Sequence, residues 1–298
     1  MTKVMNADRF LKFALEDLEE LNAFESYANR KTKLVILTAT NDEAPMRYVS
    51  NKKKMGKEFQ IEVEQIHFDK ECTNEDICNK IEELNNDETV DGIILQLSTY
   101  DHINDKIMEL INAEKDADSL TTFSKVNYRE GSEDWLIHTP CTPYGVLKLI
   151  ESYDVNIEGI EDKNVVIVGR GETSGAPMAE LFNKLNANVT VLHSRTSNKN
   201  LEKHIKEADI VVSCVGKRNL LKADWFKEDS IVIGVGLSYD ENGKQHLDFE
   251  VDEVVKLGKA RYVTNRVNCT GTATVISLIL KTILLRLKRL LPEEKYIN

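Results

Sequence analysis

The stretch Asn164-Val-Val-Ile-Val-Gly-Arg-Gly171 decides the fold, because four apolar and mostly β-branched residues run directly into glycines. A further glycine, Gly175, follows, and the residues from Ala176 to Leu185 have the composition of a helix. A second apolar segment begins at Val189. This order of strand, glycine turn, helix and strand is typical of the βαβ unit that lays a dinucleotide pyrophosphate on a helix N-terminus.

The glycines follow the spacing Gly169-x-Gly171-x-x-x-Gly175, which is one residue longer than the usual fingerprint. Glycine is needed there because a Cβ atom would block the close approach of the backbone to the phosphates. Such a turn is a weak signal when it stands alone, and a purely structural turn is the alternative. Since this turn lies between two strands, we predict that Gly169, Arg170, Gly171 and Gly175 bind a dinucleotide.

The end of the second strand indicates which dinucleotide is bound. An NAD site usually carries Asp or Glu about 20 residues beyond the glycines, where the carboxylate accepts hydrogen bonds from the ribose 2′-hydroxyl. That position falls in His193-Ser194-Arg195, which has no carboxylate. A 2′-phosphate would be repelled by a carboxylate but can accept from a hydroxyl, an imidazole or a guanidinium. We therefore expect NADP, bound by Ser194, Arg195 and Arg170; the alternative is that both arginines are solvated surface residues.

Composition narrows the classes of function. The 298 residues suffice for one large domain or two ordinary ones. A net charge of −11 argues against nonspecific binding to nucleic acid or to an anionic membrane. The five cysteines are scattered and form no Cys-x-x-Cys pair, so the sequence predicts neither a metal site nor a disulfide framework.

Two terminal segments bear on the compartment. The residues from Met1 to Lys33 are rich in charge and contain no apolar signal core. Near the other end, the apolar run from Val275 to Leu287 is interrupted by Lys281 and Arg286, well short of a membrane span. We expect that run to be a helix buried against protein, and the protein to be soluble and cytoplasmic.

Helical and strand patterns alternate along the chain, which predicts an α/β fold with largely parallel sheets. Strands are expected at 33–38, 61–67, 92–97, 164–168, 189–192, 209–215 and 230–235, and helices at 10–28, 44–59, from Thr73 or Asn74 onwards, at 105–112, 143–153, 176–185 and 272–291. The segment 119–139 loses regularity and is predicted to be a long loop.

We expect this chain to form two α/β domains. The amino-terminal domain would comprise residues 1–142, completed by a C-terminal helix (272–298) that packs back on it. Residues 143–271 would form a Rossmann-type domain with a parallel sheet.

Several polar residues stand where parallel sheets bind ligands, near the carboxyl ends of strands. Tyr48 and Lys52 are four residues apart on one face of a predicted helix. Gln96 lies within an apolar strand, where a buried amide either is hydrogen-bonded structure or contacts a ligand. Asp116 and Asp118 could equally be turn residues, and Lys52 could belong to a solvated face.

Taken together, these residues resemble the family of bifunctional methylenetetrahydrofolate dehydrogenase/cyclohydrolases. The resemblance extends over nearly the whole chain. It rests on Tyr48-Val-x-x-Lys52-x-Lys54, Glu83-Leu-Asn-Asn-Asp87, Asp91-Gly-Ile-Ile-Leu-Gln-Leu97, Lys115-Asp-Ala-Asp118, Pro140-Cys-Thr-Pro143, Val168-Gly-Arg170, Gly175-x-Pro177 and His193-Ser-Arg-Thr196.

The resemblance implies a reaction and a role for each residue. A folate would bind in a cleft between the two domains of a homodimer formed mainly through the dinucleotide-binding domains. Its 5,10-methylene bridge would be oxidised by NADP, and the methenyl product would be hydrolysed to 10-formyltetrahydrofolate. Lys52 would be the essential lysine, and Gln96 would form a hydrogen bond with it and tune it. Tyr48 would stack on the folate ring, and Asp118 would accept from its amino-pterin edge.

The sequence departs from the family pattern around the ligand sites. In the family, the segment Pro-Val-Pro-Gly-Gly-Val-Gly-Pro-Met-Thr lines the binding sites of nicotinamide and folate. Here Asn265-Arg-Val-Asn-Cys-Thr-Gly-Thr-Ala-Thr274 keeps only Gly271, a predicted substrate contact, and Thr274. The loss of prolines and glycines changes the stiffness of this segment and how closely its backbone can approach a ligand. Further departures are Pro45 and Gly171 in place of serines, Ser98 in place of a proline, Ser119 in place of a glycine and Tyr144 in place of a lysine.

These departures leave three alternatives to the bifunctional enzyme. One is a monofunctional or catalytically impaired relative that binds folate or dinucleotide without the full pair of reactions. Another is a different two-domain NADP oxidoreductase, such as a shikimate- or amino-acid-type dehydrogenase. A third is a binding or regulatory protein, which the altered segment 265–274 favours.

Overall fold

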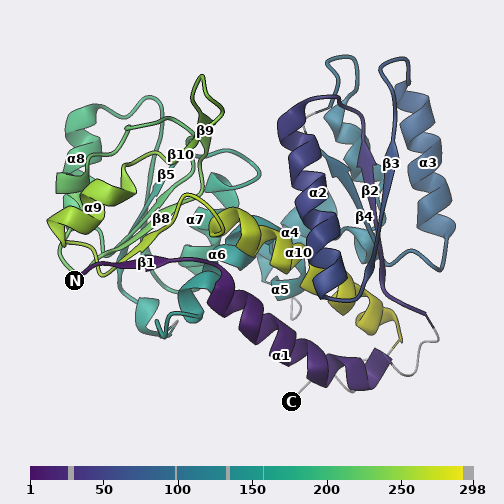
Figure 1. The fold of residues 1–298 in the computed structure, drawn as a ribbon, viewed down its shortest axis with the longest axis horizontal. Helices are drawn as coiled ribbons and strands as arrows, with labels where there is room; N and C mark the ends of the chain where they lie inside the picture. Colours follow the sequence, from purple (N-terminus) through teal and green to yellow (C-terminus); the bar gives the residue numbers. More distant parts are fainter. Residues whose placement is uncertain (26–29, 98, 132–134, 157, 291–298) are drawn as a thin grey trace. The chain divides into compact units, whose positions relative to one another are not determined.

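The computed structural model describes residues 1–25, 30–97, 99–131, 135–156 and 158–290 (Figure 1). Ser98 and the residues 26–28 and 291–298 of the two expected terminal helices lie outside these ranges. The chain forms two compact units. The six-stranded unit comprises Met1–Phe13 and Thr142–Thr274, and the three-stranded unit comprises Ala14–Cys141 and Val275–Asn298.

A parallel sheet with the order β1-β11-β8-β7-β5-β6 is the centre of the six-stranded unit. Its central strands are buried on both faces, which explains why they read as continuous apolar runs. The strands are β1 (Lys3–Met5), β5 (Asn164–Val168), β6 (Asn188–Leu192), β7 (Ile210–Ser213), β8 (Ile231–Gly234) and β11 (Tyr262–Thr264). The helices are α6 (Cys141–Glu151), α7 (Gly175–Lys184), α8 (Asn198–Glu207) and α9 (Val251–Leu257), with η3 (Glu158–Ile160), η4 (Ala223–Trp225) and a hairpin of β9 (Ser238–Tyr239) and β10 (Gln245–His246).

The first strand corrects the expected domain limits. We assigned residues 1–142 to the amino-terminal domain, but β1 pairs with β11 in register Lys3↔Tyr262 and so belongs to the six-stranded sheet. Three residues are too few to show a period in the sequence. Their pairing depends on a partner strand more than 250 positions away along the chain.

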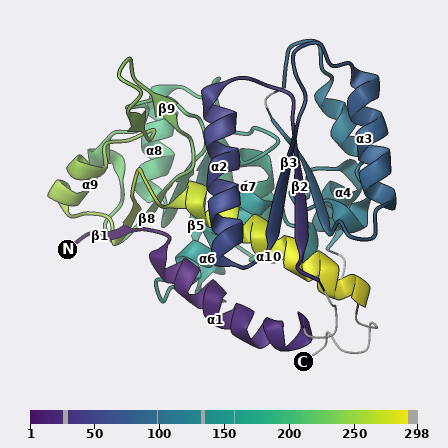
Figure 2. The same cartoon turned by 45° about the vertical axis from the view of Figure 1, so that its right-hand side comes forward.

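A parallel sheet with the order β3-β2-β4 is the centre of the three-stranded unit. Helices α2 and α3 lie on opposite sides of these strands in both views (Figures 1 and 2). The strands are β2 (Lys33–Thr38), β3 (Glu62–His67) and β4 (Gly92–Gln96). The helices are α1 (Asp8–Glu25), α2 (Glu43–Glu58), α3 (Asn74–Asn86), α4 (Thr122–Glu130), α5 (Trp135–His138) and α10 (Thr270–Leu290), with η1 (Asp105–Leu110) and η2 (Ala113–Lys115). Two of them, α1 and α10, begin in the six-stranded unit.

Most expected elements of this unit are confirmed, including the start of α3. The Thr73 side chain accepts from the backbone N–H of Asp76, whose carboxylate accepts in return from the Thr73 N–H. Two expectations were wrong. The segment 105–112 contains one 3-10 helix, η1, in place of an α-helix, and the predicted loop 119–139 contains α4 and α5.

Helix α10 is long and apolar enough to cross a membrane by length and composition, but 72% of its most apolar window is buried within the protein. This agrees with the expectation of a helix packed against protein.

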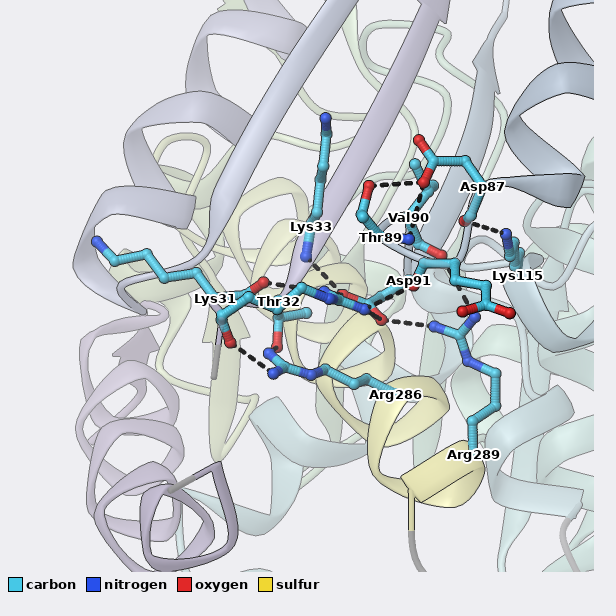
Figure 3. Close-up of polar contacts among 12 residues, drawn as sticks. Lys31, Thr32, Lys33, Asp87, Thr89, Val90, Asp91, Lys115, Arg286 and Arg289 are labelled. Carbon is cyan, nitrogen blue, oxygen red and sulfur yellow. Dashed lines mark hydrogen bonds and ion pairs between the residues drawn. The ribbon is translucent and has the colours of Figure 1, made fainter. Parts of the chain in front are cut away.

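A buried carboxylate ties β2, β4 and α10 together at one place (Figure 3). Asp91, which is fully buried directly before β4, accepts from both terminal nitrogens of Arg30 at 2.6 and 2.9 Å. It also accepts from the Lys33 N–H at 2.8 Å and from Arg289 Nη2 at 2.5 Å. One side chain thus anchors the start of two strands and the end of the last helix.

Replacing Asp91 by asparagine is expected to lower the free energy of unfolding by about 3 kcal/mol, because two guanidinium groups lose the charge that compensates them. Urea unfolding followed by circular dichroism measures the change. Asp101→Asn, which alters an exposed aspartate of the same unit, is the matched control. Equal midpoints for the two variants would contradict a structural role for Asp91.

Candidate active site

The three-stranded unit brings three of the predicted catalytic residues together. Lys52, which is only 5% exposed, lies on α2 one turn beyond Tyr48. Its Nζ donates to Gln96 Oε1 at 2.9 Å and lies 5.8 Å from the centroid of the Tyr48 ring. Gln96 ends β4 in register with Thr38, the last residue of β2, so the three side chains gather at the carboxyl edge of the sheet.

Hydrogen bonds also fix the orientation of the Gln96 amide. Its Nε2 donates to the Leu97 carbonyl at 2.6 Å, which leaves Oε1 to accept from Lys52. An acceptor held in this way keeps the Lys52 amine in one place, since the amine has three donors and no acceptor when protonated. Gln96 is therefore both a satisfied, partly buried amide and a contact of the predicted catalytic lysine.

The surroundings of Lys52 change its acidity. Burial lowers the pKa of the Lys52 ammonium from its ordinary value, and the nearby Asp118 and Cys141 oppose that shift. A buried lysine with a lowered pKa, next to a carboxylate and an aromatic ring, is a recurrent feature of functional sites.

The structure separates the roles within Lys115-Asp-Ala-Asp118. Lys115 Nζ donates to the carbonyls of Leu84, Asn85 and Asp87 near the end of α3, at 2.8 to 2.9 Å. Asp116 accepts from the backbone and the hydroxyl of Thr121 and from the Ser124 hydroxyl, so it is turn chemistry, as one alternative held. Asp118, which is half-buried, is close enough to Lys52 to act on its pKa. Asp118 is therefore the ligand candidate of this motif.

The Asp116 contacts also explain why the prediction for 119–139 failed. Thr121 caps α4 and Gly131 ends it with φ +70. Both signals are visible in the sequence, but the helix has only nine residues. The buried Asp116 that accepts hydrogen bonds from Thr121 and Ser124 lies five and eight residues before them, and a lone aspartate gives no sign of these contacts in the sequence.

The dinucleotide candidates lie at the carboxyl edge of the six-stranded sheet. Strand β5 pairs with β6 in register Val168↔Leu192 and with β7 in register Val168↔Ser213. The glycine turn therefore leaves the sheet beside His193, and the Gly169 N–H donates to the Leu192 carbonyl at 2.8 Å.

Each glycine of the turn is required for a different reason. Gly169 has φ +117, a conformation that favours glycine, and an added Cβ would lie 2.8 Å from the Cys214 carbonyl oxygen. A Cβ on Gly175 would lie 2.5 Å from the Gly169 carbonyl oxygen. Around Gly171, by contrast, there is no atom within 4 Å of the Cβ position among the described residues. Gly169 and Gly175 therefore shape the turn, and Gly171 leaves space in front of it.

The segment after β6 forms a tight turn that exposes the predicted phosphate ligands. The Thr196 N–H donates to the His193 carbonyl at 2.7 Å, and Thr196 Oγ1 accepts from the His193 N–H at 3.0 Å. His193 Nδ1 accepts from the Arg195 N–H at 3.2 Å. The side chains of Ser194, Arg195 and Arg170 are exposed, as an anion-binding edge requires.

Gly271 and the altered segment 265–274 lie in the six-stranded unit. Gly271 is in the first turn of α10. The Asn265 N–H ties the segment to β1 by donating to the Met5 carbonyl at 2.9 Å, and Asn268 Nδ2 ties it to the start of α1 by donating to Asp8 Oδ1 at 2.7 Å. These contacts are specific to the residues that replace the family's prolines and glycines.

One residue of this edge was missed in the sequence. Asp248, fully buried, accepts from Ser213 Oγ and from the backbone of Val215 and Lys217 at 2.5 to 3.0 Å. It thereby shapes the loop after β7 that packs against Gly169. The available signal was a single aspartate between the apolar residues Leu247 and Phe249.

Within the described part of the chain, no group of three or more His, Cys, Asp or Glu residues could hold a metal ion.

Two family models match the chain. The catalytic domain of tetrahydrofolate dehydrogenase/cyclohydrolase matches residues 6–118, and the NAD(P)-binding domain of the same family matches residues 140–290. Together they cover most of the sequence and both units.

Individual relatives agree with these matches. The bifunctional protein FolD of Staphylococcus haemolyticus is 33% identical over 285 residues, covering 95% of this chain and 96% of that protein. The corresponding protein of Staphylococcus epidermidis is 36% identical over 253 residues, covering 85% of each.

Solved structures are similar over the same length. The bifunctional FolD dehydrogenase/cyclohydrolase of Campylobacter jejuni has a TM-score of 0.88 and 29% identity, covering 97% of this chain and 100% of that one. The Trypanosoma brucei enzyme, solved with NADP and an inhibitor, has a TM-score of 0.89 and 26% identity, covering 98% and 99%.

Proposed function

The chain belongs to the tetrahydrofolate dehydrogenase/cyclohydrolase family, and on that basis we propose that it is the bifunctional enzyme. It oxidises 5,10-methylenetetrahydrofolate to 5,10-methenyltetrahydrofolate with NADP and hydrolyses the product to 10-formyltetrahydrofolate. The observation that carries this proposal is the buried Lys52 amine held by Gln96 beside the Tyr48 ring. No sequence departure from the family removes any of these three groups.

Lys52 serves the hydrolytic step. Its amine polarises the bound one-carbon unit or assists proton movement around the attacking water. Gln96 holds the amine in place, which keeps the orientation ready before the substrate arrives. The lowered pKa means that Lys52 gives up its proton more readily than an exposed lysine does.

Two residues recognise the folate. The Tyr48 ring offers a large, rigid face for stacking on the pterin. The Asp118 carboxylate, half-buried near Lys52, accepts hydrogen bonds from the amino-pterin edge. We also assign Gly271 to the substrate contacts, since it is one of two residues that the altered segment shares with the family.

The turn after β5 fits NADP. When bound, the nicotinamide accepts the hydride from the methylene carbon. The open space at Gly171 admits the pyrophosphate, while Gly169 and Gly175 keep the turn in shape. The exposed side chains of Ser194 and Arg195, with Arg170, donate to the 2′-phosphate.

The function is tested by following both half-reactions with NAD and NADP in parallel. We expect NADPH to appear with 5,10-methylenetetrahydrofolate, and the methenyl chromophore to decay on hydrolysis. Turnover of one step alone would establish the monofunctional alternative. Binding of folate without any turnover would establish the catalytically impaired one.

Replacing Arg195 by alanine is expected to weaken NADP binding by about 10- to 100-fold and NAD binding by much less, because a charge-assisted hydrogen bond to the 2′-phosphate contributes about 1.5–3 kcal/mol. Calorimetric titration with both dinucleotides measures the ratio. Arg261→Ala is the control, since Arg261 is exposed at the amino end of β11, away from the carboxyl edge of the sheet. Equal losses for NAD and NADP would show that Arg195 does not read the phosphate.

We also propose that the enzyme is a homodimer, formed mainly through the dinucleotide-binding domains, and that it works in the cytoplasm. The five cysteines are all free thiols in the structure, and a reducing compartment would keep them so. The net charge of −11 supports a small-molecule substrate over a nucleic-acid or membrane partner. Light scattering coupled to size-exclusion chromatography tests the dimer, and a monomeric mass would contradict it.

A further inference from the structure

The three-stranded unit buries a third lysine in addition to Lys52 and Lys115, and the proposed mechanism does not use it. Lys281 is 1% exposed in the middle of α10, where it interrupts the apolar run. Its Nζ donates to the Thr139 carbonyl at 2.6 Å and to Ser119 Oγ. Both acceptors are neutral, and no ion pair of Lys281 occurs among the described residues. Burying an amine whose partners are all neutral is costly.

Ser119 has an uncommon backbone conformation. Its φ is +55, in the left-handed region that favours glycine, and its side chain is 1% exposed. A non-glycine residue there costs about 1 kcal/mol or more and persists only when its surroundings hold it. Ser119 is also the position where the family pattern has glycine.

The Ser119 hydroxyl is held on both sides. It accepts from Lys281 Nζ and donates to the Ile137 carbonyl at 3.0 Å, while the Ser119 N–H donates to the Asp116 carbonyl at 3.2 Å. Lys281 therefore links α10 to the turn that follows Asp118. Since Ser119 directly follows Asp118, holding the Ser119 backbone in place also restricts where the Asp118 backbone lies.

Electrostatic contacts place Lys281 in the same neighbourhood as Lys52. Burial lowers the pKa of Lys281, and Cys141, Asp116 and Asp118 oppose that shift. The buried Cys141 thiol donates to the Ala117 carbonyl at 3.2 Å. Burial raises the pKa of this thiol and Asp118 raises it further, while Lys281 and Lys52 oppose the rise. Asp118 thus lies within electrostatic range of two buried lysines.

We propose that Lys281 is a positioning residue of the folate site, which holds Ser119 in its left-handed conformation and thereby aims the Asp118 carboxylate at the pterin. The inference rests on the proposed function, because it assigns Asp118 to folate recognition. Lys281 touches neither the reacting carbon nor the dinucleotide. Its loss should therefore weaken substrate binding and leave the chemical steps nearly intact.

The test is a cycle of Lys281→Met and Ser119→Gly. Lys281→Met is expected to raise KM for 5,10-methylenetetrahydrofolate about tenfold and to change kcat less than about twofold. A tenfold change corresponds to the loss of about one hydrogen bond, the one that orients Ser119. KM for NADP should not change. Glycine adopts φ +55 without strain and has no hydroxyl, so Lys281→Met should change KM less than about twofold in the Ser119→Gly background.

Ser119→Ala keeps the proposal testable if Lys281→Met does not fold. This variant deletes the hydroxyl link but keeps the Cβ atom, so it should raise KM as Lys281→Met does. Thermal unfolding of all variants separates the two roles, since a merely structural lysine would lower Tm without moving KM. Unchanged KM in Lys281→Met or Ser119→Ala, or an equal effect of Lys281→Met in both backgrounds, overturns the proposal.

The wild-type protein distinguishes this failure from failure of the proposed function. Calorimetry with the stable analogue 5-formyltetrahydrofolate measures folate binding without turnover. A wild-type protein that does not bind it would overturn the proposed function and this inference together. Wild-type binding that Lys281→Met and Ser119→Ala leave unweakened would overturn the inference alone.

Discussion

Replacing Lys52 by methionine is expected to abolish hydrolysis of the methenyl substrate, with a loss of about 10²- to 10⁴-fold, the range for removal of a positioned acid–base group. Methionine fills a similar volume but has neither the charge nor the donors that Lys52 Nζ directs at Gln96. The decay of methenyltetrahydrofolate absorbance measures the rate. The fold should survive, because the change removes a buried amine and leaves its apolar stem.

Lys54→Met is the matched control. Lys54 lies on the same helix two residues further on and is exposed, so the same substitution there should leave hydrolysis unchanged. Near-normal hydrolysis by Lys52→Met would remove this lysine from the mechanism. Equal losses in both variants would indicate a general effect on α2.

Replacing Gly175 by alanine is expected to lower NADP affinity at least 100-fold and the free energy of unfolding by about 3 kcal/mol, the upper range for overpacking. The new Cβ would lie 2.5 and 2.6 Å from the carbonyl oxygen and carbon of Gly169 and 2.8 Å from the Arg170 nitrogen. All three are backbone atoms, which cannot rotate away as a side chain does. The turn must therefore move, and the pyrophosphate site moves with it. Calorimetry with NADP and urea unfolding measure the two effects.

Gly171→Ala tests whether NADP binding needs the open space in front of the turn as well as the shape of the turn. With no described atom within 4 Å of its Cβ position, this variant should unfold at the same urea concentration as the wild type. Its NADP affinity should still fall, because the methyl group occupies the approach of the phosphates. If Gly175→Ala binds NADP normally, the turn has no part in cofactor binding.

The central strands could be predicted because their signal is local. Both faces are buried in the strand segments Val165 to Val168 and Leu34 to Leu37, so each can be recognised in the sequence as a run of apolar residues. The same holds for the capped start of α3 at Thr73. The glycine turn was predictable too, because it needs residue types that few other structures require.

Elements that depend on distant partners could not be predicted. β1 has three residues and exists through β11. The loop after β7 depends on Asp248, a buried carboxylate whose partners lie more than 30 residues earlier in the chain. A single aspartate looks the same in the sequence whether it caps a turn or faces solvent.

The candidate site likewise has features that the sequence determines and others that depend on the fold. The sequence by itself determined the family, the α/β class and the residue types at the site, because Lys52, Gln96, Asp118 and the glycines each lie in a short local motif. Only the tertiary structure decided which side chains touch across the chain: the Lys52 amine on Gln96 and the Lys281 amine on Ser119. The physical reason is that hydrogen bonds and burial act between atoms that folding brings within about 3 Å, whatever their separation along the chain.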